Sequence, residues 1–296
     1  MKNISVIGAG TMGNGIAHCF AQKGFQVYLI DLSTESLNNA KNTIQNNLSR
    51  MISKGIISDE EKNHIFARID FQTQLNESVK NSDLVIEAVT EKESVKLDIF
   101  KKLDQLCNKN TILASNTSSI SIAKIGAATN RKDKVIGMHF MNPVPLMKLV
   151  EVIKSESTSK ETVDIIIKLS ETLGKVPVLV NDFPGFVANR ILLPMINEAI
   201  HALDEGVSGV SEIDTVMILG MSHPMGPLQL ADFIGLDVCL SILQVLHEGF
   251  QNPKYKPNRL LQTMVKNQEL GIKTKRGFYD YSNGIKEKFI SKRFTS

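Results

Sequence analysis

The sequence contains the stretch Ile4-Ser5-Val6-Ile7-Gly8-Ala9-Gly10-Thr11-Met12-Gly13 close to its start, and this stretch decides the fold. Its first four residues are typical of a short buried strand, and a GxGxxG loop follows at once. A helical pattern with one apolar face comes next and ends at Gly24, and a second strand pattern over residues 25–30 ends in Asp31. This order predicts a Rossmann-type dinucleotide-binding domain.

Each glycine of the loop has a physical role in such a domain. Gly8 permits the tight turn, Gly10 lets a pyrophosphate approach the backbone, and Gly13 lets the helix pack against the strand. The other residues of the predicted cofactor loop are Ala9, Thr11 and Met12. A glycine-rich turn without a ligand is the alternative, but the flanking strand, helix and acid favour a cofactor. Asp31 would bind the adenine ribose hydroxyls and repel a 2′-phosphate, which favours NAD over NADP.

Two helical patterns form an insertion in this domain. Residues 34–53 carry an apolar stripe that Gly55 ends, and Ser58 with Glu61 is a capping box that opens a second helix. The simplest arrangement is an inserted helical hairpin. Its polar face carries Lys54 among other basic residues, and a solvated charged face is favoured there over a bound anion.

Polar residues follow two further apolar strand patterns. Glu91 comes after residues 83–89, and Ser118 comes after residues 111–114. Polar side chains directly after parallel strands lie at the carboxyl edge of a sheet, where ligands bind. Glu91 and Ser118 are therefore cofactor or substrate candidates. For Ser118 the alternative, an N-cap for a helix that starts near Ile120, is equally favoured by spacing.

An imidazole and a carboxylate end two short apolar runs separated by a proline-containing turn. His139 follows one strand pattern and Glu151 lies within the next, so the two side chains can meet if the strands are neighbours. Imidazole exchanges protons near neutrality, as a dehydrogenase requires, and a carboxylate partner would fix its tautomer. A structural histidine is the alternative interpretation.

Composition excludes several classes of protein. The chain has 296 residues, of which 42% are hydrophobic and 22% charged, as in a packed globular protein. The chain has 34 Lys and Arg residues and 31 Asp and Glu residues. This excess of positive charge is small, so nucleic acid is not an expected partner. No apolar run approaches the length of a membrane span, and we expect no membrane partner. Three scattered cysteines favour neither disulfides nor a zinc site, so we expect no metal and a cytoplasmic location.

Strand patterns stop near Asp182, and helical patterns follow. We therefore expect residues 1–182 to form the dinucleotide-binding domain and residues 183–296 an all-α domain with a C-terminal tail. The helix expected over residues 186–203 is apolar around most of its circumference. A small domain seldom buries such a helix alone, so we expect a homodimer formed through the helical domain.

With these residues assembled, the sequence resembles the 3-hydroxyacyl-CoA dehydrogenase family, in particular its short bacterial 3-hydroxybutyryl-CoA dehydrogenases. The resemblance runs from Ile4 to about Tyr281 and includes several long motifs in the correct order. These motifs are GAGTMGNGIA at Gly8, ASNTSSISI at Ala114, GMHFMNPVPLMKLVEV at Gly137, FPGFVANRILLPMINEA at Phe183 and EIDTVMILGMSHPMGPLQLADFIGLD at Glu212.

The resemblance implies roles for individual residues. His139 would be the general base and Glu151 its orienting partner, while Ser118 and Asn189 would hold the substrate oxygen and the thioester carbonyl. The positions that match family contacts to NAD are Ser118, Glu91, Lys96, Asn142 and Lys273. Lys54 matches a position that touches the CoA nucleotide, which raises the anion-binding interpretation of the hairpin.

The implied reaction is NAD-dependent oxidation of a short (S)-3-hydroxyacyl-CoA to the 3-ketoacyl-CoA, or the reverse reduction of acetoacetyl-CoA, in fatty acid or butanoate metabolism. A dehydrogenase for a free hydroxy acid is the enzymatic alternative. A non-catalytic NAD-binding scaffold is the alternative from another class.

Overall fold

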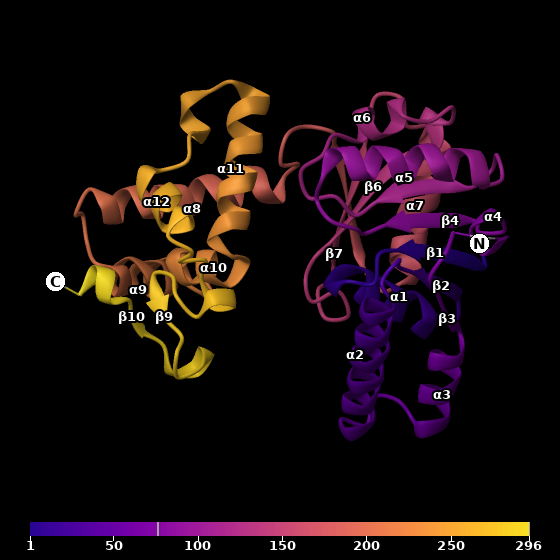
Figure 1. Ribbon diagram of the computed structural model, residues 1–296, viewed down its shortest axis with the longest axis horizontal. Helices are drawn as coiled ribbons and strands as arrows, with labels where there is room; N and C mark the ends of the chain where they lie inside the picture. Colours follow the sequence, from indigo (N-terminus) through magenta and orange to yellow (C-terminus); the bar gives the residue numbers. More distant parts are fainter. Residues whose placement is uncertain (76, 296) are drawn as a thin grey trace. The chain divides into compact units, whose positions relative to one another are not determined.

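The computed structural model of the chain describes residues 1–75 and 77–295. The chain divides into two compact units, Met1–Phe183 and Pro184–Ser296 (Figure 1). The first unit is built on a sheet and the second is helical, so the predicted α/β fold followed by a helical domain is confirmed.

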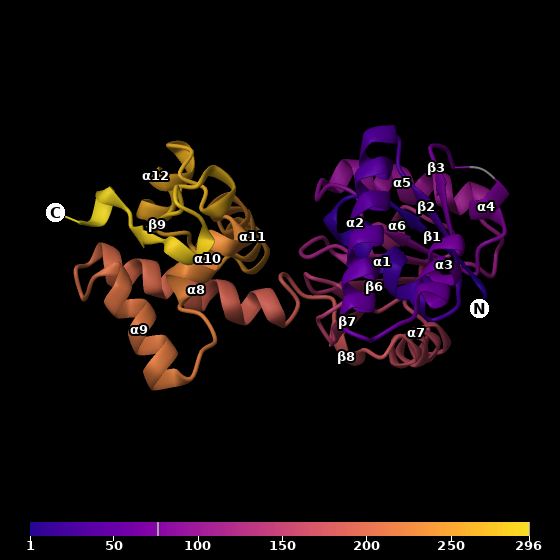
Figure 2. The same cartoon turned by 90° about the horizontal axis from the view of Figure 1, so that it is seen from below.

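The sheet of the first unit has eight strands in the order β3-β2-β1-β4-β5-β6-β7-β8, so β3 and β8 lie at opposite ends (Figure 2). All neighbours are parallel except β6 and β7, which are antiparallel. The order up to β6 is that of a dinucleotide-binding sheet. The strands are β1 (Asn3–Ile7), β2 (Gln26–Ile30), β3 (Ile69–Gln72), β4 (Leu84–Glu87), β5 (Ile112–Ser115), β6 (Val135–Phe140), β7 (Leu149–Lys154) and β8 (Val176–Asn181).

Helices cover both faces of this sheet. Helices α5 and α6 lie on one face of the sheet (Figure 1). Helix α1 packs on the other face, and its apolar side chains share one core with those of α7. The central strands are buried on both faces, which explains why they read as continuous apolar runs rather than alternating ones. The helices are α1 (Thr11–Gln22), α2 (Thr34–Ser53), α3 (Asp59–Ala67), α4 (Glu77–Lys80), α5 (Glu93–Leu106), α6 (Ile122–Ala127) and α7 (Lys160–Thr172).

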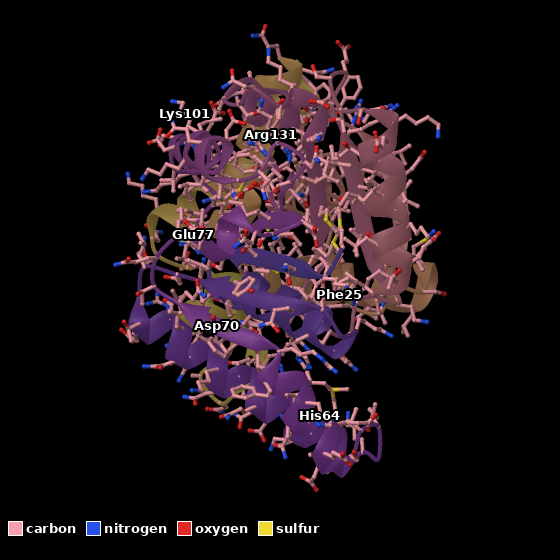
Figure 3. The ribbon with its side chains drawn as sticks, turned by 90° about the vertical axis from the view of Figure 1, so that its right-hand side faces the viewer. Phe25, His64, Asp70, Glu77, Lys101 and Arg131 are labelled. Carbon is pink, nitrogen blue, oxygen red and sulfur yellow. The ribbon has the colours of Figure 1, made fainter. Side chains whose placement is uncertain are left out.

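The inserted hairpin predicted from the sequence consists of α2 and α3, which lie side by side beyond the sheet (Figure 1). The Ser58 hydroxyl accepts the Glu61 N–H, and the Glu61 carboxylate accepts the Ser58 N–H, so the capping box is complete. His64 lies on this hairpin, in α3 (Figure 3). The edge strand β3 was not predicted, because it has only four residues, of which two are apolar and two polar, and these give a weak pattern.

The second unit is a helical bundle with its own core. Its helices are α8 (Ala188–Asp204), α9 (Val210–Met221), α10 (Pro227–Ile234), α11 (Leu236–Phe250) and α12 (Arg259–Lys266). The segment after α12 packs back on this core through Phe278, Tyr279 and Tyr281. It also forms a two-stranded ribbon, β9 (Tyr279–Asp280) with β10 (Phe289–Ile290), which the sequence pattern did not reveal because each strand has only two residues.

Among the described residues, no single helix is both long and apolar enough to cross a membrane. Helices α10 and α11 reach the required length and apolarity only as a pair, and the chain bends by 97° between them. Both helices contribute side chains to the core of the second unit.

Candidate active site

His139 and Glu151 form a direct contact. The two residues are opposite each other in the antiparallel pairing of β6 with β7. His139 Nδ1 lies 2.8 Å from Glu151 Oε2. An ionised carboxylate can only accept, so Nδ1 donates, and the basic nitrogen of the neutral ring is Nε2. The pairing of the strands therefore sets the tautomer that a general base needs.

This pair is almost fully removed from water. The exposed fraction is 9% for His139 and 2% for Glu151. In such surroundings an imidazolium is costly unless a counter-charge lies beside it, and Glu151 supplies that charge. The arrangement is that of a proton acceptor with an orienting carboxylate.

The loop after β5 is organised by Glu91. Glu91 Oε1 accepts hydrogen bonds from Thr117 Oγ1 at 2.5 Å and from the backbone N–H of Ser118 and Ser119 at 2.8 and 3.1 Å. The hydroxyls of both serines donate to the same oxygen at 3.1 Å. Burial opposes ionisation of Glu91, but the nearby Lys96 ammonium and these donors outweigh it and hold the pKa of Glu91 below its usual value. A single carboxylate thus fixes the orientation of Ser118.

Ser118 is not the cap of the helix that follows. Helix α6 begins at Ile122, and its cap is Ser121, whose hydroxyl accepts the N–H of Lys124. The N-cap interpretation of Ser118 is therefore wrong, because the chain turns for three further residues before it becomes helical.

The loops after β5 and β6 are tied together. The backbone N–H of Phe140, the residue after His139, donates to Asn116 Oδ1 at 2.9 Å. The N–H of Asn116 in turn donates to the carbonyl of Glu87 at the end of β4. Three neighbouring strands therefore end in one connected group at the carboxyl edge of the sheet.

The glycine loop has the geometry of a phosphate-binding turn. Gly8 has φ +102, and a Cβ there would lie 2.6 Å from the carbonyl oxygen of Ala88. A Cβ at Gly13 would lie 1.7 Å from the carbonyl oxygen of Gly8, so only glycine lets α1 approach the strand. A Cβ at Gly10 would meet nothing within 4 Å, so its backbone faces open space at the start of α1.

A cavity of about 580 Å³ lies over this loop, and its lining includes Gly8, Gly10, Thr11, Met12 and Asp31. Asp31 directly follows β2, and its two carboxylate oxygens accept the N–H of Ala9 at 2.8 Å and the N–H of Ser33 at 2.9 Å. Asp31 thus fixes the glycine loop and brings a negative charge to the cavity. The residues fit a dinucleotide whose adenosine half carries no 2′-phosphate.

Other predicted site residues differ in their surroundings. Asn142 is exposed just after β6, and Lys54 is exposed at the end of α2. Lys96 is 1% exposed and pairs with Glu87 and Glu91. Two of the predicted site residues, Asn189 and Lys273, belong to the second unit. Asn189 is half-buried in the first turn of α8, and Lys273 forms an ion pair with Asp237.

The sequence reasoning gave no role to two buried polar residues at this edge. Glu87 is fully buried at the end of β4, and a carboxylate inside an apolar strand run signals a buried partner. Lys175 donates from Nζ to the carbonyls of Val144 and Met147 at 2.5 and 2.7 Å. It thereby anchors the loop that carries Asn142, and its only sequence signal is its place directly before a strand.

Comparison with known proteins identifies relatives over nearly the whole chain. Residues 3–183 match the family model of the 3-hydroxyacyl-CoA dehydrogenase NAD binding domain, and residues 185–281 match that of the 3-hydroxyacyl-CoA dehydrogenase C-terminal domain. The resemblance seen in the sequence is thereby confirmed.

Two bacterial relatives and one solved structure illustrate the similarity. A probable 3-hydroxybutyryl-CoA dehydrogenase of Bacillus subtilis is 52% identical over 281 residues, which cover 95% of this chain and 98% of the relative. The 3-hydroxybutyryl-CoA dehydrogenase of Bradyrhizobium diazoefficiens is also 52% identical and covers 95% and 96%. The crystal structure of (S)-3-hydroxybutyryl-CoA dehydrogenase from Ralstonia eutropha superposes with a TM-score of 0.92 at 47% identity, over 95% of this chain and 99% of that one.

Proposed function

Because the chain belongs to the 3-hydroxyacyl-CoA dehydrogenase family, we propose that it interconverts (S)-3-hydroxybutyryl-CoA and acetoacetyl-CoA in an NAD-dependent reaction. The observation that carries this proposal is the His139–Glu151 pair, which lies in the same sheet as β1, the strand that leads into the glycine loop. A proton acceptor and a dinucleotide cradle in one domain are the two parts that oxidation of a hydroxyl requires.

The chain's own residues handle the proton. His139 Nε2 accepts the proton of the substrate 3-hydroxyl, and the charge on the ring is stabilised by Glu151 at Nδ1. NAD, when bound, supplies the acceptor for the hydride that leaves C3. In the reverse direction the protonated His139 returns its proton to the carbonyl oxygen of the ketone.

Two side chains hold the substrate oxygens in this proposal. The hydroxyl of Ser118, which donates to Glu91 in the free protein, turns to donate to the oxygen at C3 and stabilises its charge, while the backbone N–H of Ser118 stays on Glu91. Asn189, from the first turn of α8, is the amide donor assigned to the thioester carbonyl. Lys54 on the hairpin is the cation assigned to the CoA nucleotide.

The cofactor contacts divide between two groups of residues. The glycine loop and Asp31 hold the adenosine and the pyrophosphate. The remaining assigned contacts are Glu91, Lys96, Ser118, Asn142 and Lys273. Because the Lys96 ammonium is buried between two carboxylates, its contribution to cofactor binding is made through Glu91.

We propose that the chain forms a homodimer through its second unit. Helix α9 buries only Val210 and Asp214 in that unit. On the same helix Val216, Leu219 and Met221 are 60%, 79% and 61% exposed. Apolar side chains gathered on one helix and left in water are typical of a subunit interface. We also propose a cytoplasmic location, since all three cysteines are free and buried, and a role in fatty acid or butanoate metabolism that follows from the substrate class.

The test is NADH oxidation by the purified chain with acetoacetyl-CoA, with acetoacetate in parallel and with NADPH in place of NADH. We expect turnover with acetoacetyl-CoA and NADH and little with the other combinations. Equal turnover of acetoacetate would identify an enzyme for free hydroxy acids. Tight NADH binding without turnover of any tested ketone would identify a non-catalytic scaffold.

A further inference from the structure

A fully buried carboxylate lies at the point where β4, β5 and α5 meet. The side chain of Glu87 is 0% exposed. Its Oε1 accepts from Lys96 Nζ at 2.6 Å and from the N–H of Val89 at 2.7 Å. Its Oε2 accepts from Ser115 Oγ at 2.6 Å. These contacts offset the cost of burying this charge, so their geometry is strongly favoured.

The Lys96 ammonium connects Glu87 to the loop that carries Ser118. It lies 2.6 Å from Glu87 Oε1 and 3.2 Å from Glu91 Oε2. With Oε2 directed to Lys96, Glu91 presents Oε1 to the donors of Thr117, Ser118 and Ser119. The position of Ser118 therefore depends on a sequence of contacts that begins at Glu87.

A second route joins the same residues. Glu87 and Ser115 are paired in register at the ends of β4 and β5. Ser115 Oγ donates to Glu87 and accepts the N–H of Thr117 at 3.2 Å. Glu87 thus contacts the last residue before the Ser118 loop directly, through a short charge-assisted hydrogen bond.

We propose that Glu87 is a positioning residue for the reaction, which orients Ser118 through Lys96 and Glu91 and touches neither substrate nor cofactor. This role rests on the proposed function of Ser118. Among the residues that the structure describes, replacement of Glu87 by Gln leaves Glu91 as the one carboxylate paired with Lys96. Glu91 is then drawn toward the ammonium, and its contacts with residues 117–119 loosen.

The first test is amide hydrogen exchange of the cofactor-free protein, since the N–H groups of Ser118 and Ser119 both donate to Glu91. We expect exchange at these two amides to be at least about tenfold faster in Glu87→Gln. The matched control is Asp104→Asn, which breaks the ion pair of Asp104 with Arg131 near the other end of α5. The control should leave exchange at Ser118 and Ser119 unchanged.

The second test is kinetic. We expect kcat for acetoacetyl-CoA reduction to fall about 10-fold to 100-fold in Glu87→Gln, as misplacement of a reacting group does. The primary isotope effect with NADH deuterated at the transferred position should rise, because hydride transfer becomes limiting. Asp104→Asn, which loses an ion pair whose side chains are 8% and 10% exposed, should keep both the rate and the isotope effect.

The outcomes separate the two proposals. If the unmodified chain reduces no acetoacetyl-CoA, the proposed function fails, and hydrogen exchange still decides whether Glu87 orders the loop. Should Glu87→Gln not fold, Glu87→Gln with Lys96→Met removes both buried charges. Glu91 then loses the ammonium that directs its Oε2, and a loss of protection at the same two amides is expected. Unchanged exchange at Ser118 and Ser119 in the folded variant overturns the positioning role, as does an unchanged kcat in an active enzyme.

Discussion

His139 and Glu151 are opposite residues on antiparallel strands, and their side chains meet at 2.8 Å between Nδ1 and Oε2. The contact arises because β6 and β7 form the only antiparallel pair among the described strands of the large sheet. The connection over residues 141–148 reverses the chain after Phe140 and returns it as the neighbouring strand. A parallel crossover of the usual length could not bring these two residues together within twelve positions of sequence.

Replacing Glu151 by Gln tests the electrostatic part of this contact. The amide oxygen can still accept from Nδ1, but it carries no charge to stabilise the imidazolium. We expect kcat to fall by about 10-fold or more, with the acidic limb of the pH–rate profile for hydroxyacyl-CoA oxidation moved to lower pH. An identical pH profile in Glu151→Gln would contradict an electrostatic role.

Replacing His139 by Gln removes the proton acceptor. We expect a fall in kcat of about 10²-fold to 10⁴-fold in both directions, the range for loss of a general acid–base group. Binding of NADH, followed by its fluorescence, should stay within about threefold, since the residues that line the cofactor cavity are intact. Near-normal turnover in this variant would show that His139 is structural.

Replacing Asp31 by Asn tests cofactor selectivity. The carboxylate accepts two backbone N–H groups and brings the negative charge beside the cofactor cavity. We expect kcat/KM for NADH to fall and the ratio of NADPH to NADH use to rise by about tenfold, because the repulsion of a 2′-phosphate is lost. A ratio that does not change would mean that other groups exclude NADPH.

The dinucleotide-binding half of the fold could be predicted because its signals are local. The glycine loop, the strand before it and Asp31 all lie within one βαβ unit, and each glycine is required by a close approach within that unit. The His139–Glu151 contact could also be anticipated, since a short turn between two apolar runs indicates neighbouring strands.

The Glu87 network could not be predicted in the same way. Its members come from β4, β5, α5 and two loops, and only the folded sheet brings Glu87 beside Ser115. From spacing alone, Ser118 was equally well interpreted as a helix N-cap or as a site residue. The choice depends on the residue at which α6 begins, and the sequence does not fix that residue. Hydrogen bonds between distant segments were the deciding contacts, and a single sequence does not display them.

The proposed dimer can be tested on α9. Leu219 is 79% exposed, and a charge there should prevent burial against a second copy. We expect Leu219→Asp to sediment as a monomer at concentrations where the unmodified chain is a dimer. Ile56→Asp is the control, since Ile56 is 59% exposed on the hairpin of the first unit, and it should remain dimeric. A dimeric Leu219→Asp would place the interface elsewhere.

The second unit should lose stability as the pH rises, because of Asp232. Its carboxylate is 1% exposed and accepts the N–H of Phe278, the N–H of Tyr279 and the hydroxyl of Tyr281. Burial raises the pKa of Asp232 to about 7, against the effect of these three donors, and the neighbouring Asp214 adds to the increase. The folded state therefore holds a proton that the unfolded chain releases near its ordinary pKa of about 3.9.

The sign of the effect follows from this difference. The stabilisation by the protonated Asp232 is complete below about pH 4 and is lost as the pH rises through about 7, by at most about 1.4 kcal/mol per pH unit. Urea unfolding between pH 5 and pH 8 measures it. Tyrosine fluorescence reports mainly on this unit, since the chain has no Trp and three of its 4 Tyr lie there. Asp232→Asn cannot ionise and should show a flatter dependence; equal slopes for the two proteins would assign the pH effect to other groups.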